Sequence, residues 1–514
     1  MKTTGPITAL ALSALLALTA CTALPPRPAM PDAFAPLPAA EGVMAERLDP
    51  AEAQHPGESG FRLVSTGTEA YALRAYSARV ATRSLDIQTY IWHGDFTGKL
   101  LAQRALEAAD RGVQVRILVD DMDARARNAG FAALDAHERI EVRVFNPFAS
   151  RRGTLSRIGE LGTGLKRLNH RMHNKSWIAD NRIALVGGRN LGDEYFGASA
   201  ESNFVDLDLL MVGPVVPQVS ASFDRFWNAP SNYPIAAINK EPPTAEALAR
   251  VRAVLRATPA EVASSPYATV LREDPAVQRL IAGEGTLHWS RDWTFVSDDP
   301  HKGDQDAAQF KHSAVLEALA PAMRSSRHEL RVISPYFVPG RLGTKGLLDV
   351  AGTGVDVRVL TNSLAATDVA AVHSGYARYR KDLLKGGVQL WELKPTSNAP
   401  SRFSLRGSSG SSLHTKALVI DDRQVFVGSY NLDPRSTSLN TEQGVLVSHP
   451  QLAQELTQAF EEQSRGTHAW QVQQVDGNLR WSDGTQTWTR DPEATMGRRM
   501  QVWLVRLLPV QSQL

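Results

Sequence analysis

The chain of 514 residues contains a single cysteine, Cys21, so a disulfide bond within the chain is impossible. It also lacks an excess of charge of either sign, because 56 basic and 54 acidic residues leave a formal net charge of only +2. The composition therefore gives little support to a protein that binds nucleic acid through bulk electrostatic attraction. Hydrophobic residues make up 43% of the chain and charged residues 21%, which favours a body with a large core.

A mature membrane-spanning segment is also missing, since the apolar run at residues 7–20 is too short to form one. Residues 18–21 (LTAC) resemble a bacterial lipobox, and lipidation would explain why the sole thiol stands at Cys21. We expect residues 1–20 to be a lipoprotein signal peptide and residues 21–45 to be a proline-rich tether. The protein would be a lipoprotein of the bacterial cell envelope that faces the periplasm. Thr22, by resemblance to enterobacterial sorting rules, favours the outer over the inner membrane.

One motif occurs twice in the chain. Residues 173–180 (HNKSWIAD) and residues 414–421 (HTKALVID) share the pattern H-x-K-x4-D. Each is followed at the same offset by a short segment that ends in asparagine, residues 188–190 (GRN) and residues 429–431 (SYN). Two matches with matched flanks make coincidence improbable and indicate a duplicated half-site.

Each motif reads as the first strand of a hairpin. Side chains alternate along a strand, so His173 and Lys175 share one face, as do His414 and Lys416. The aspartates of the two motifs, Asp180 and Asp421, fall at the hairpin turns. We keep these aspartates in the motif, but expect them to fix the turn or to pair with an arginine rather than to touch substrate.

The paired motifs resemble those of the phospholipase D superfamily, whose members carry one HKD motif in each of two pseudo-symmetric lobes. Upstream patterns are shared as well, since residues 112–117 parallel residues 354–359 at an offset of about 242. The resemblance implies an α/β fold with two lobes, each a mixed sheet covered by helices. The expected boundaries are residues 46–235 for lobe 1, 236–300 for a helical connection, 301–465 for lobe 2, and 466–514 for a C-terminal hairpin and helix.

Phosphodiester cleavage requires a nucleophile, a proton donor for the leaving oxygen, and positive charge near the phosphoryl oxygens. By the family resemblance, His173 is the nucleophile that forms a phosphohistidine and His414 is the general acid and base, although the pseudo-symmetry leaves the reverse assignment open. Neither a metal nor a cofactor is required. The remaining assignments are Lys175 and Lys416 for the phosphoryl oxygens, and Asn190 and Asn431 for further hydrogen bonds to substrate.

A histidine nucleophile usually has its second ring nitrogen oriented by a carboxylate. Each lobe offers one downstream of its own motif, Asp206 in lobe 1 and Glu442 in lobe 2. Asp193, Glu194 and Asp208 are competing candidates in lobe 1.

Several flanking segments resemble the bacterial cardiolipin synthases of this superfamily: residues 90–93 (YIWH), 170–175 (HRMHNK), 187–196 (GGRNLGDEYF) and 334–340 (SPYFVPG). The resemblance implies transfer of a phosphatidyl group from phosphatidylglycerol or phosphatidylethanolamine to phosphatidylglycerol. Phospholipid substrates and a membrane are then the partners, whereas no protein partner is inferable. Three alternatives stay open: a phospholipase D that hydrolyses lipids, a nuclease or other phosphodiesterase of the same superfamily, and a lipoprotein that binds lipid without catalysis.

Four further features have less certain uses. His93 and His373 are expected to be ordinary residues of a cleft or helix surface. Basic residues crowd residues 151–171, which either attract anionic headgroups or form a solvated loop. The C-terminal tryptophans and residues 500–508 (MQVWLVRLL) suit either a membrane interface or, as we expect, core packing.

Overall fold

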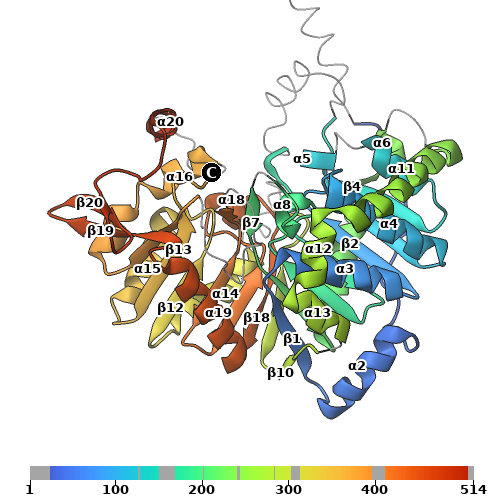
Figure 1. Cartoon of the computed structure of the whole chain (residues 1–514), viewed down its shortest axis with the longest axis horizontal. Coiled ribbons are helices and arrows are strands. Elements are labelled where there is room, and N and C mark those ends of the chain that lie inside the picture. Colours follow the sequence, from blue (N-terminus) through green and yellow to red (C-terminus); the bar gives the residue numbers. More distant parts are fainter. Residues whose placement is uncertain are drawn as a thin grey trace, which may run out of the picture.

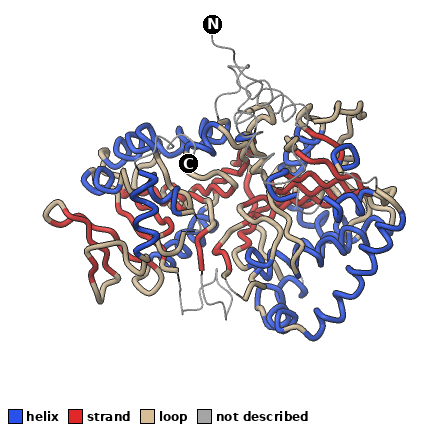
Figure 2. The backbone as a smooth tube through the Cα atoms, turned by 90° about the horizontal axis from the view of Figure 1, so that it is seen from above, coloured by secondary structure: helices blue, strands red, loops and turns tan. Residues whose placement is uncertain are grey.

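The structure is a computed structural model that describes residues 24–124, 128–149, 168–200, 202–239, 243–282, 284–302, 313–367, 369–395 and 411–506. Figures 1 and 2 show two lobes side by side, each with a sheet in its interior and helices on its outside. Cys21, the signal peptide expected before it, and residues 151–167 of the basic stretch lie outside the described residues.

Lobe 1 is built on a nine-stranded mixed sheet with the order β10-β1-β8-β6-β5-β2-β3-β4-β9. Strands β2, β3 and β4 are parallel, and the motif hairpin β5–β6 joins them antiparallel through β2. The strands are β1 (Ser59–Val64), β2 (Ser84–Thr89), β3 (Gln114–Asp120), β4 (Ile140–Phe145), β5 (Ser176–Ala179), β6 (Ile183–Gly187), β8 (Asp208–Val212), β9 (Asn232–Pro234) and β10 (His288–Ser290).

Lobe 2 repeats this arrangement in a ten-stranded sheet with the order β11-β18-β17-β16-β12-β13-β14-β19-β20-β21. Its parallel strands are β12, β13 and β14, and its motif hairpin is β16–β17. The strands are β11 (Trp293–Ser297), β12 (Glu329–Ile333), β13 (Asp356–Asn362), β14 (Gln389–Leu393), β16 (Ala417–Ile420), β17 (Gln424–Gly428), β18 (Gln443–Ser448), β19 (Ala469–Val475), β20 (Asn478–Ser482) and β21 (Thr487–Trp488). The pseudo-symmetry expected from the repeated motifs is therefore present at the level of strand order.

Helices cover the outer face of each sheet (Figure 1). In lobe 1, α3 (Gly67–Val80) and α4 (Phe96–Asp110) are preceded by the N-cap residues Thr66 and Asp95, whose side chains accept backbone N–H groups of the first turn. The connecting helices α11 (Ala245–Ser264), α12 (Pro266–Glu273) and α13 (Pro275–Ala282) pack on α3 and α4, outside the sheet. In lobe 2 the outer helices are α14 (Ala314–Arg324), α15 (Gly340–Ala351), α16 (Ala370–Tyr376) and α17 (Arg380–Lys385). No helix of the described chain has the length and apolar character needed to cross a bilayer.

The two lobes share one hydrophobic core at their interface. It combines the inner faces of both motif hairpins, including Ile178 and Val427, with Phe223 of α9 (Val215–Trp227) and Leu456 of α19 (Pro450–Ser464). These side chains are at most 1% exposed. Because burying a large apolar side chain stabilises the fold by about 1.5–3 kcal/mol, separation of the lobes would be costly.

A short parallel pair of strands crosses from one lobe to the other near the motifs. Strand β7 (Asn203–Val205) of lobe 1 pairs with β15 (Ser411–Leu413) of lobe 2. A single bridge in the same sense joins Met172 to Thr441. Each HKD motif is therefore preceded by a segment that is held by the opposite lobe.

The C-terminal segment follows our expectation only in part. Trp470 and Trp481 of the hairpin are buried in the core of lobe 2, as expected. The expectation of core packing holds for only one side of α20 (Met496–Arg506), because Val502 is buried whereas the side chains of Met500 and Trp503 are exposed.

Candidate active site

The two motif histidines lie at the interface between the lobes, next to the backbone pairs that join them. The backbone N–H of His173 donates to the carbonyl of Thr441 at 3.0 Å, and that of His414 donates to the carbonyl of Val205 at 2.8 Å. Both imidazoles are almost fully buried. Strands β5 and β16 begin at Ser176 and Ala417, so each histidine and lysine lies just before its strand rather than within it.

Each histidine is oriented by a carboxylate of the other lobe. The Nδ1 of His173 donates to Glu442 at 2.8 Å, and the Nδ1 of His414 donates to Asp206 at 2.6 Å. Our sequence analysis named these two acids as candidates downstream of the motifs without assigning either to a particular histidine, and the structure pairs each with the histidine of the opposite lobe. The crossing of β7 and β15 explains the exchange, because Asp206 directly follows β7 and is carried beside the motif of lobe 2.

The carboxylate of Glu442 accepts from three donors. Apart from His173, the hydroxyls of Ser429 and Ser436 donate to its two oxygens at 2.5 Å and 2.8 Å. Burial by itself raises the pKa of Glu442, but the charge and hydrogen bond of His173, with Lys175 and Ser429, outweigh burial and lower it. Glu442 is therefore ionised at neutral pH and able to accept from the imidazole.

The carboxylate of Asp206 is closely packed against the backbone around it. Its Oδ1 accepts the N–H of Leu207 at 2.8 Å, and its Oδ2 faces His414. A Cβ placed on Gly188 would collide with this carboxylate, so glycine is required at that position. Burial opposes ionisation here too, but His414 and Lys416 lower the pKa of Asp206 overall.

A buried ion pair lies next to each of these two carboxylates. Next to Asp206, Asp208 pairs with Arg74 at 2.9 Å and with Arg189 at 3.4 Å. Next to Glu442, the N–H of that residue donates to Asp298, which pairs with Lys302 at 2.6 Å. A buried carboxylate without such a partner would be destabilising, so these pairs maintain the ionised surroundings of the site.

The competing acids of lobe 1 serve other elements. Asp208 forms the ion pairs with two arginines that are described above. Asp193 accepts the N–H of Thr97 at 2.7 Å in the first turn of α4. Glu194 forms an ion pair with His93 at 3.0 Å. The structure thus singles out Asp206 as the carboxylate in contact with a motif histidine of lobe 2.

Both motif lysines are buried beside the histidines. The ammonium of Lys175 donates to the carbonyl of His173 at 2.6 Å, and that of Lys416 donates to the carbonyl of His414. Within the described residues, no carboxylate lies within ion-pair distance of Lys175. Burial, together with repulsion from Lys416, lowers the pKa of Lys175 to about 7, although Glu442 acts in the opposite direction. An anion that enters the site would therefore meet an ammonium group with unsatisfied donors.

Both imidazoles are neutral near pH 7. Burial lowers the pKa of His173 to about 4, against the opposing charge of Glu442. Burial and the charge of Lys416 likewise lower the pKa of His414. With Nδ1 donating to a carboxylate, the Nε2 of each neutral ring carries a lone pair that can attack or accept a proton.

Aromatic side chains line the histidines, and our sequence analysis did not name them as site residues. The ring of Tyr90 meets His173 edge-on, with centroids 5.2 Å apart. Tyr195 and Phe204 contact His414 at 5.3 Å and 5.1 Å. Tyr90 and Tyr195 lie in segments that were singled out by pattern, but pattern alone does not reveal that they touch the imidazoles.

The two asparagines expected to bind substrate differ in their surroundings. Asn190 accepts the N–H of Ile91 at 3.2 Å and donates to the hydroxyl of Tyr195 at 2.8 Å, so its amide positions an aromatic neighbour of His414. Asn431 is buried, and its Oδ1 has no hydrogen-bond partner within the described residues. Asn431 is the asparagine with spare hydrogen-bonding capacity.

The motif aspartates anchor the start of a neighbouring strand. Asp180 accepts the backbone N–H groups of Thr82, Arg83 and Ser84 at 2.8–3.1 Å. Asp421 repeats this role in lobe 2 with three successive N–H groups, those of residues 327–329, at 2.7–3.1 Å. These acids have a structural role at the far end of the motif hairpin, and neither contacts a motif histidine. The alternative expectation, pairing with an arginine side chain, does not describe them.

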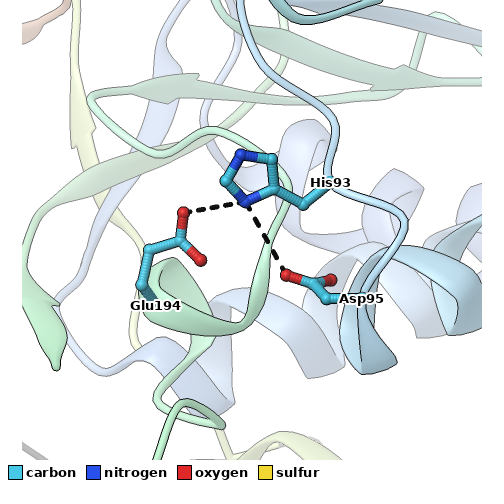
Figure 3. Close-up of side chains that lie close together, drawn as sticks. All are labelled: His93, Asp95 and Glu194. Atoms are coloured by element: carbon cyan, nitrogen blue, oxygen red, sulfur yellow. Dashed lines mark ion pairs between the residues drawn. The ribbon is translucent and has the colours of Figure 1, made fainter. Parts of the chain in front are cut away.

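Two other predicted features take definite places. Arg171 is not part of a solvated basic patch, since it is 1% exposed and pairs with Asp120 at 3.2 Å. Figure 3 shows His93 between Glu194 and Asp95. A ring nitrogen of His93 and one carboxylate oxygen from each acid lie within 4.8 Å of one another. Asp95 already accepts the N–H groups of Gly98 and of Asp193. The trio thus joins the start of α4 to the segment that carries Tyr195.

Comparison with known proteins finds matches over most of the chain. The sequence model of the family described as "Cardiolipin synthase, PLD-like domain" matches residues 77–227 and 319–464. The chain is 40% identical over 481 residues to cardiolipin synthase C of Escherichia coli (strain K12), covering 91% of this chain and 99% of that protein. It is 24% identical over 384 residues to cardiolipin synthase A of Pseudomonas syringae pv. syringae, covering 74% of this chain and 63% of that protein.

Among solved structures, phosphatidylserine synthase of Haemophilus influenzae has the same fold, with a TM-score of 0.54 at 12% identity. That alignment covers 91% of this chain and 99% of the other. The fold and the superfamily inferred from the repeated motifs are thereby confirmed. The chain belongs to the cardiolipin synthase family of proteins with phospholipase D-like domains, and it is a phosphatidyltransferase of the phospholipase D type.

Proposed function

We propose that the chain makes cardiolipin by transferring a phosphatidyl group from phosphatidylglycerol or phosphatidylethanolamine to phosphatidylglycerol. The observation that carries the proposal is the pair of buried histidines, each oriented by a carboxylate of the opposite lobe and each beside a lysine. The 40% identity to cardiolipin synthase C supports the choice of lipid.

In the first step, the Nε2 of neutral His173 attacks phosphorus while the bond from phosphorus to the leaving alcohol oxygen breaks. His414 donates its proton to that oxygen. His414 must therefore be protonated at this point, and the negative charge of a bound phosphodiester, together with Asp206, favours its imidazolium. Lys175 and Lys416 stabilise the phosphoryl oxygens.

In the second step, His414 removes the proton of the acceptor alcohol, whose oxygen attacks phosphorus. The bond between phosphorus and His173 breaks, and both histidines return to their starting state. Asn431 is the asparagine we assign to a further hydrogen bond with the substrate, because its Oδ1 has no partner within the described residues. Asn190 acts instead by positioning Tyr195.

Replacement of either histidine tests the scheme. We expect His173→Ala and His414→Ala each to lower kcat by about 10³-fold or more, in line with loss of a nucleophile or of general acid and base catalysis. His137→Gln is the matched control, since this histidine pairs with Asp110 on lobe 1 away from the site. Near-normal turnover by either alanine variant would contradict a two-histidine mechanism.

Labelled phosphatidylglycerol, followed by acid-free quenching and peptide mapping, tests the roles of the two histidines. We expect the phosphoryl label on the peptide that contains His173, and label on the peptide of His414 would reverse the assignment. Product analysis separates the functions: cardiolipin supports transfer, whereas phosphatidic acid alone favours the phospholipase D alternative. Cleavage of an oligonucleotide without turnover of lipid would favour the nuclease alternative.

We also propose that Cys21 carries a lipid that anchors the protein in the cell envelope, facing the periplasm. The lipobox-like residues 18–21 and the single cysteine of the chain support this proposal. Mass analysis of the processed N-terminus tests it. A diacylglyceryl group on Cys21 is the expected result, and an unmodified thiol in the membrane fraction would contradict it.

A further inference from the structure

Helix α20 (Met496–Arg506) presents an apolar face to solvent. Four of its large hydrophobic side chains are exposed: Met496 (83%), Met500 (59%), Trp503 (60%) and Leu504 (50%). Their spacing of four, three and one residues puts them on one side of a helix. Val502, by contrast, is buried against the body of the protein.

Exposed apolar side chains are concentrated on this helix. The described residues contain eleven large hydrophobic side chains that are exposed, and four of them belong to α20. Single exposed hydrophobic residues need no explanation, but a group of them on one short helix marks an interaction surface. Trp and Met with neighbouring arginines are also the composition of helices that lie in a membrane interface.

A strongly basic cavity opens beside α20. It has a volume of about 610 Å³ and lies between α20, α17 and the hairpin of β20 and β21. Trp503 of the apolar face lines it as well, so cavity and face are continuous. The cavity is lined by five cationic side chains, those of Lys381, Arg480, Arg490, Arg499 and Arg506, and by one acid, Asp491.

The positive charge of this cavity is not compensated locally. Asp491 is already paired with Arg380 at 2.9 Å, and it lies 3.5 Å from His373. Within the part of the chain that the structure describes, none of the five lining cations forms an ion pair. Burial, with repulsion from Arg378 and Arg380, lowers the pKa of Arg506, which reflects a positive potential at the site. In a chain with a net charge of only +2, this potential is a local feature.

Helix α20 is connected to the active site by a short route. It packs on α16, and the guanidinium of Arg498 donates to three carbonyls, those of Leu364, Ala365 and Thr367, at 2.8–2.9 Å. These carbonyls follow β13, whose last residue, Asn362, holds the backbone of Leu413, the neighbour of His414. Figure 1 shows α20 beyond α16, on the side of the molecule where α18 (Pro434–Ser438), β7 and α8 (Asp193–Phe196) also lie.

We propose that α20 and the adjoining basic cavity form a docking site for a bilayer that contains anionic phospholipids. Met500 and Trp503 enter the interfacial layer, and the arginines of the cavity bind lipid phosphates. Charge complementarity selects this occupant, because a basic cavity continuous with an apolar face matches a phosphate joined to acyl chains. Docking in this way brings the bilayer to the side of the molecule that holds the active site.

Flotation of the full-length chain with lipid vesicles tests the apolar face. All proteins carry Cys21→Ala, so that a lipid anchor does not contribute to the differences. We expect Met500→Asp with Trp503→Asp to reduce binding to phosphatidylglycerol vesicles by tenfold or more. Leu342→Asp is the matched control, because Leu342 is 87% exposed on α15. Thermal unfolding verifies that these surface variants are folded.

The same assay tests the basic cavity. We expect Arg480→Ala with Arg490→Ala to reduce the preference for phosphatidylglycerol over phosphatidylcholine vesicles by about tenfold, and 0.5 M NaCl to have a similar effect on the unmodified chain. Arg341→Ala with Lys345→Ala is the control for loss of two cations, since the cavity of about 600 Å³ there contains both acids and bases.

Three results would overturn the proposal. The first is unchanged flotation of both double variants. The second is a dimer in sedimentation velocity without lipid that Met500→Asp with Trp503→Asp converts to monomer, since the face would then bind a second copy. The third is thermal stabilisation by inorganic phosphate that depends on Arg480 and Arg490 in a chain that does not float. None of these measurements depends on turnover, so they are separate from the test of the proposed function.

Discussion

Lys175 is a buried amine that, within the described residues, has no carboxylate at ion-pair distance. Burial lowers its pKa to about 7, so the folded protein holds its ammonium form at a cost in stability. Such a group is useful only when an anion arrives. The arrangement therefore stores a positive charge for the substrate at the expense of the stability of the free enzyme.

Replacement of this lysine by a neutral chain of similar size should stabilise the protein. The folded pKa of Lys175 lies below its unfolded value, so the penalty is complete at and below pH 7 and disappears as the pH rises towards 10.5. We expect Lys175→Met to raise the free energy of unfolding by a few kcal/mol at pH 7 while activity is lost. Denaturant unfolding at pH 7 and at pH 9.5 measures this, and the gain should shrink at the higher pH. A gain that grows with pH would contradict the assignment, and Lys345→Met is the control for an exposed lysine.

Much of the site at the scale of residues was predictable from the sequence. The repeated motif identified both histidines and both lysines, and the acids downstream of them included Asp206 and Glu442. What the sequence did not contain was the exchange of these acids between the lobes. A linear pattern records the distance along the chain, whereas the pairing depends on the path of β7 across the interface.

At the scale of elements, the turn that directly follows β6 positions the carboxylate that orients the histidine of the opposite lobe. Gly188 lies against the carboxylate of Asp206, and Ser429 takes the corresponding place in lobe 2, where it donates to Glu442. One lobe uses the absence of a side chain and the other uses a hydroxyl to fix the orienting acid.

Addition of a methyl group at Gly188 should therefore act across the interface. We expect Gly188→Ala to displace Asp206 from His414 and to lower kcat by about 10²-fold or more, as for loss of general acid and base catalysis. Gly130→Ala is the matched control, because a Cβ at Gly130 meets nothing within 4 Å. Steady-state kinetics and the pH profile measure the effect. Unchanged activity of Gly188→Ala would mean that Asp206 does not orient His414.

The mixed sheet covered by helices that the family resemblance implied for each lobe is present in the structure (Figure 1). The exposed apolar face of helix α20 was not predicted, because core packing was expected for this segment. An amphipathic pattern shows that a helix has an apolar face, but it does not show whether protein or solvent covers that face.

At the scale of the whole molecule, the shared core couples the lobes. Leu456 of α19 is fully buried there, together with apolar residues of both motif hairpins. Inter-domain interfaces are usually small and more polar than this one, so separate unfolding of two lobes is the ordinary expectation for a chain of this length.

We expect the lobes instead to unfold in one transition. Leu456→Ala should destabilise the protein by about 2–5 kcal/mol and lower the Tm without splitting the transition. Leu347→Ala, in the separate outer core of lobe 2, is the control for a buried leucine away from the interface. Differential scanning calorimetry measures both. Two resolved transitions in either variant would show that the lobes are independent.

The exchange of acids between the lobes has a consequence for the ancestry of the chain. A single-lobe ancestor with this geometry would have had an unoriented histidine, and two copies related by a twofold axis would each have supplied the acid that the other lacked. The two halves of the present chain depend on each other in the same way, since each lobe supplies the acid that orients the histidine of the other. Because both halves belong to one chain, they need not be identical, and they differ at this point: Gly188 lies against Asp206 in one half, and Ser429 donates to Glu442 in the other.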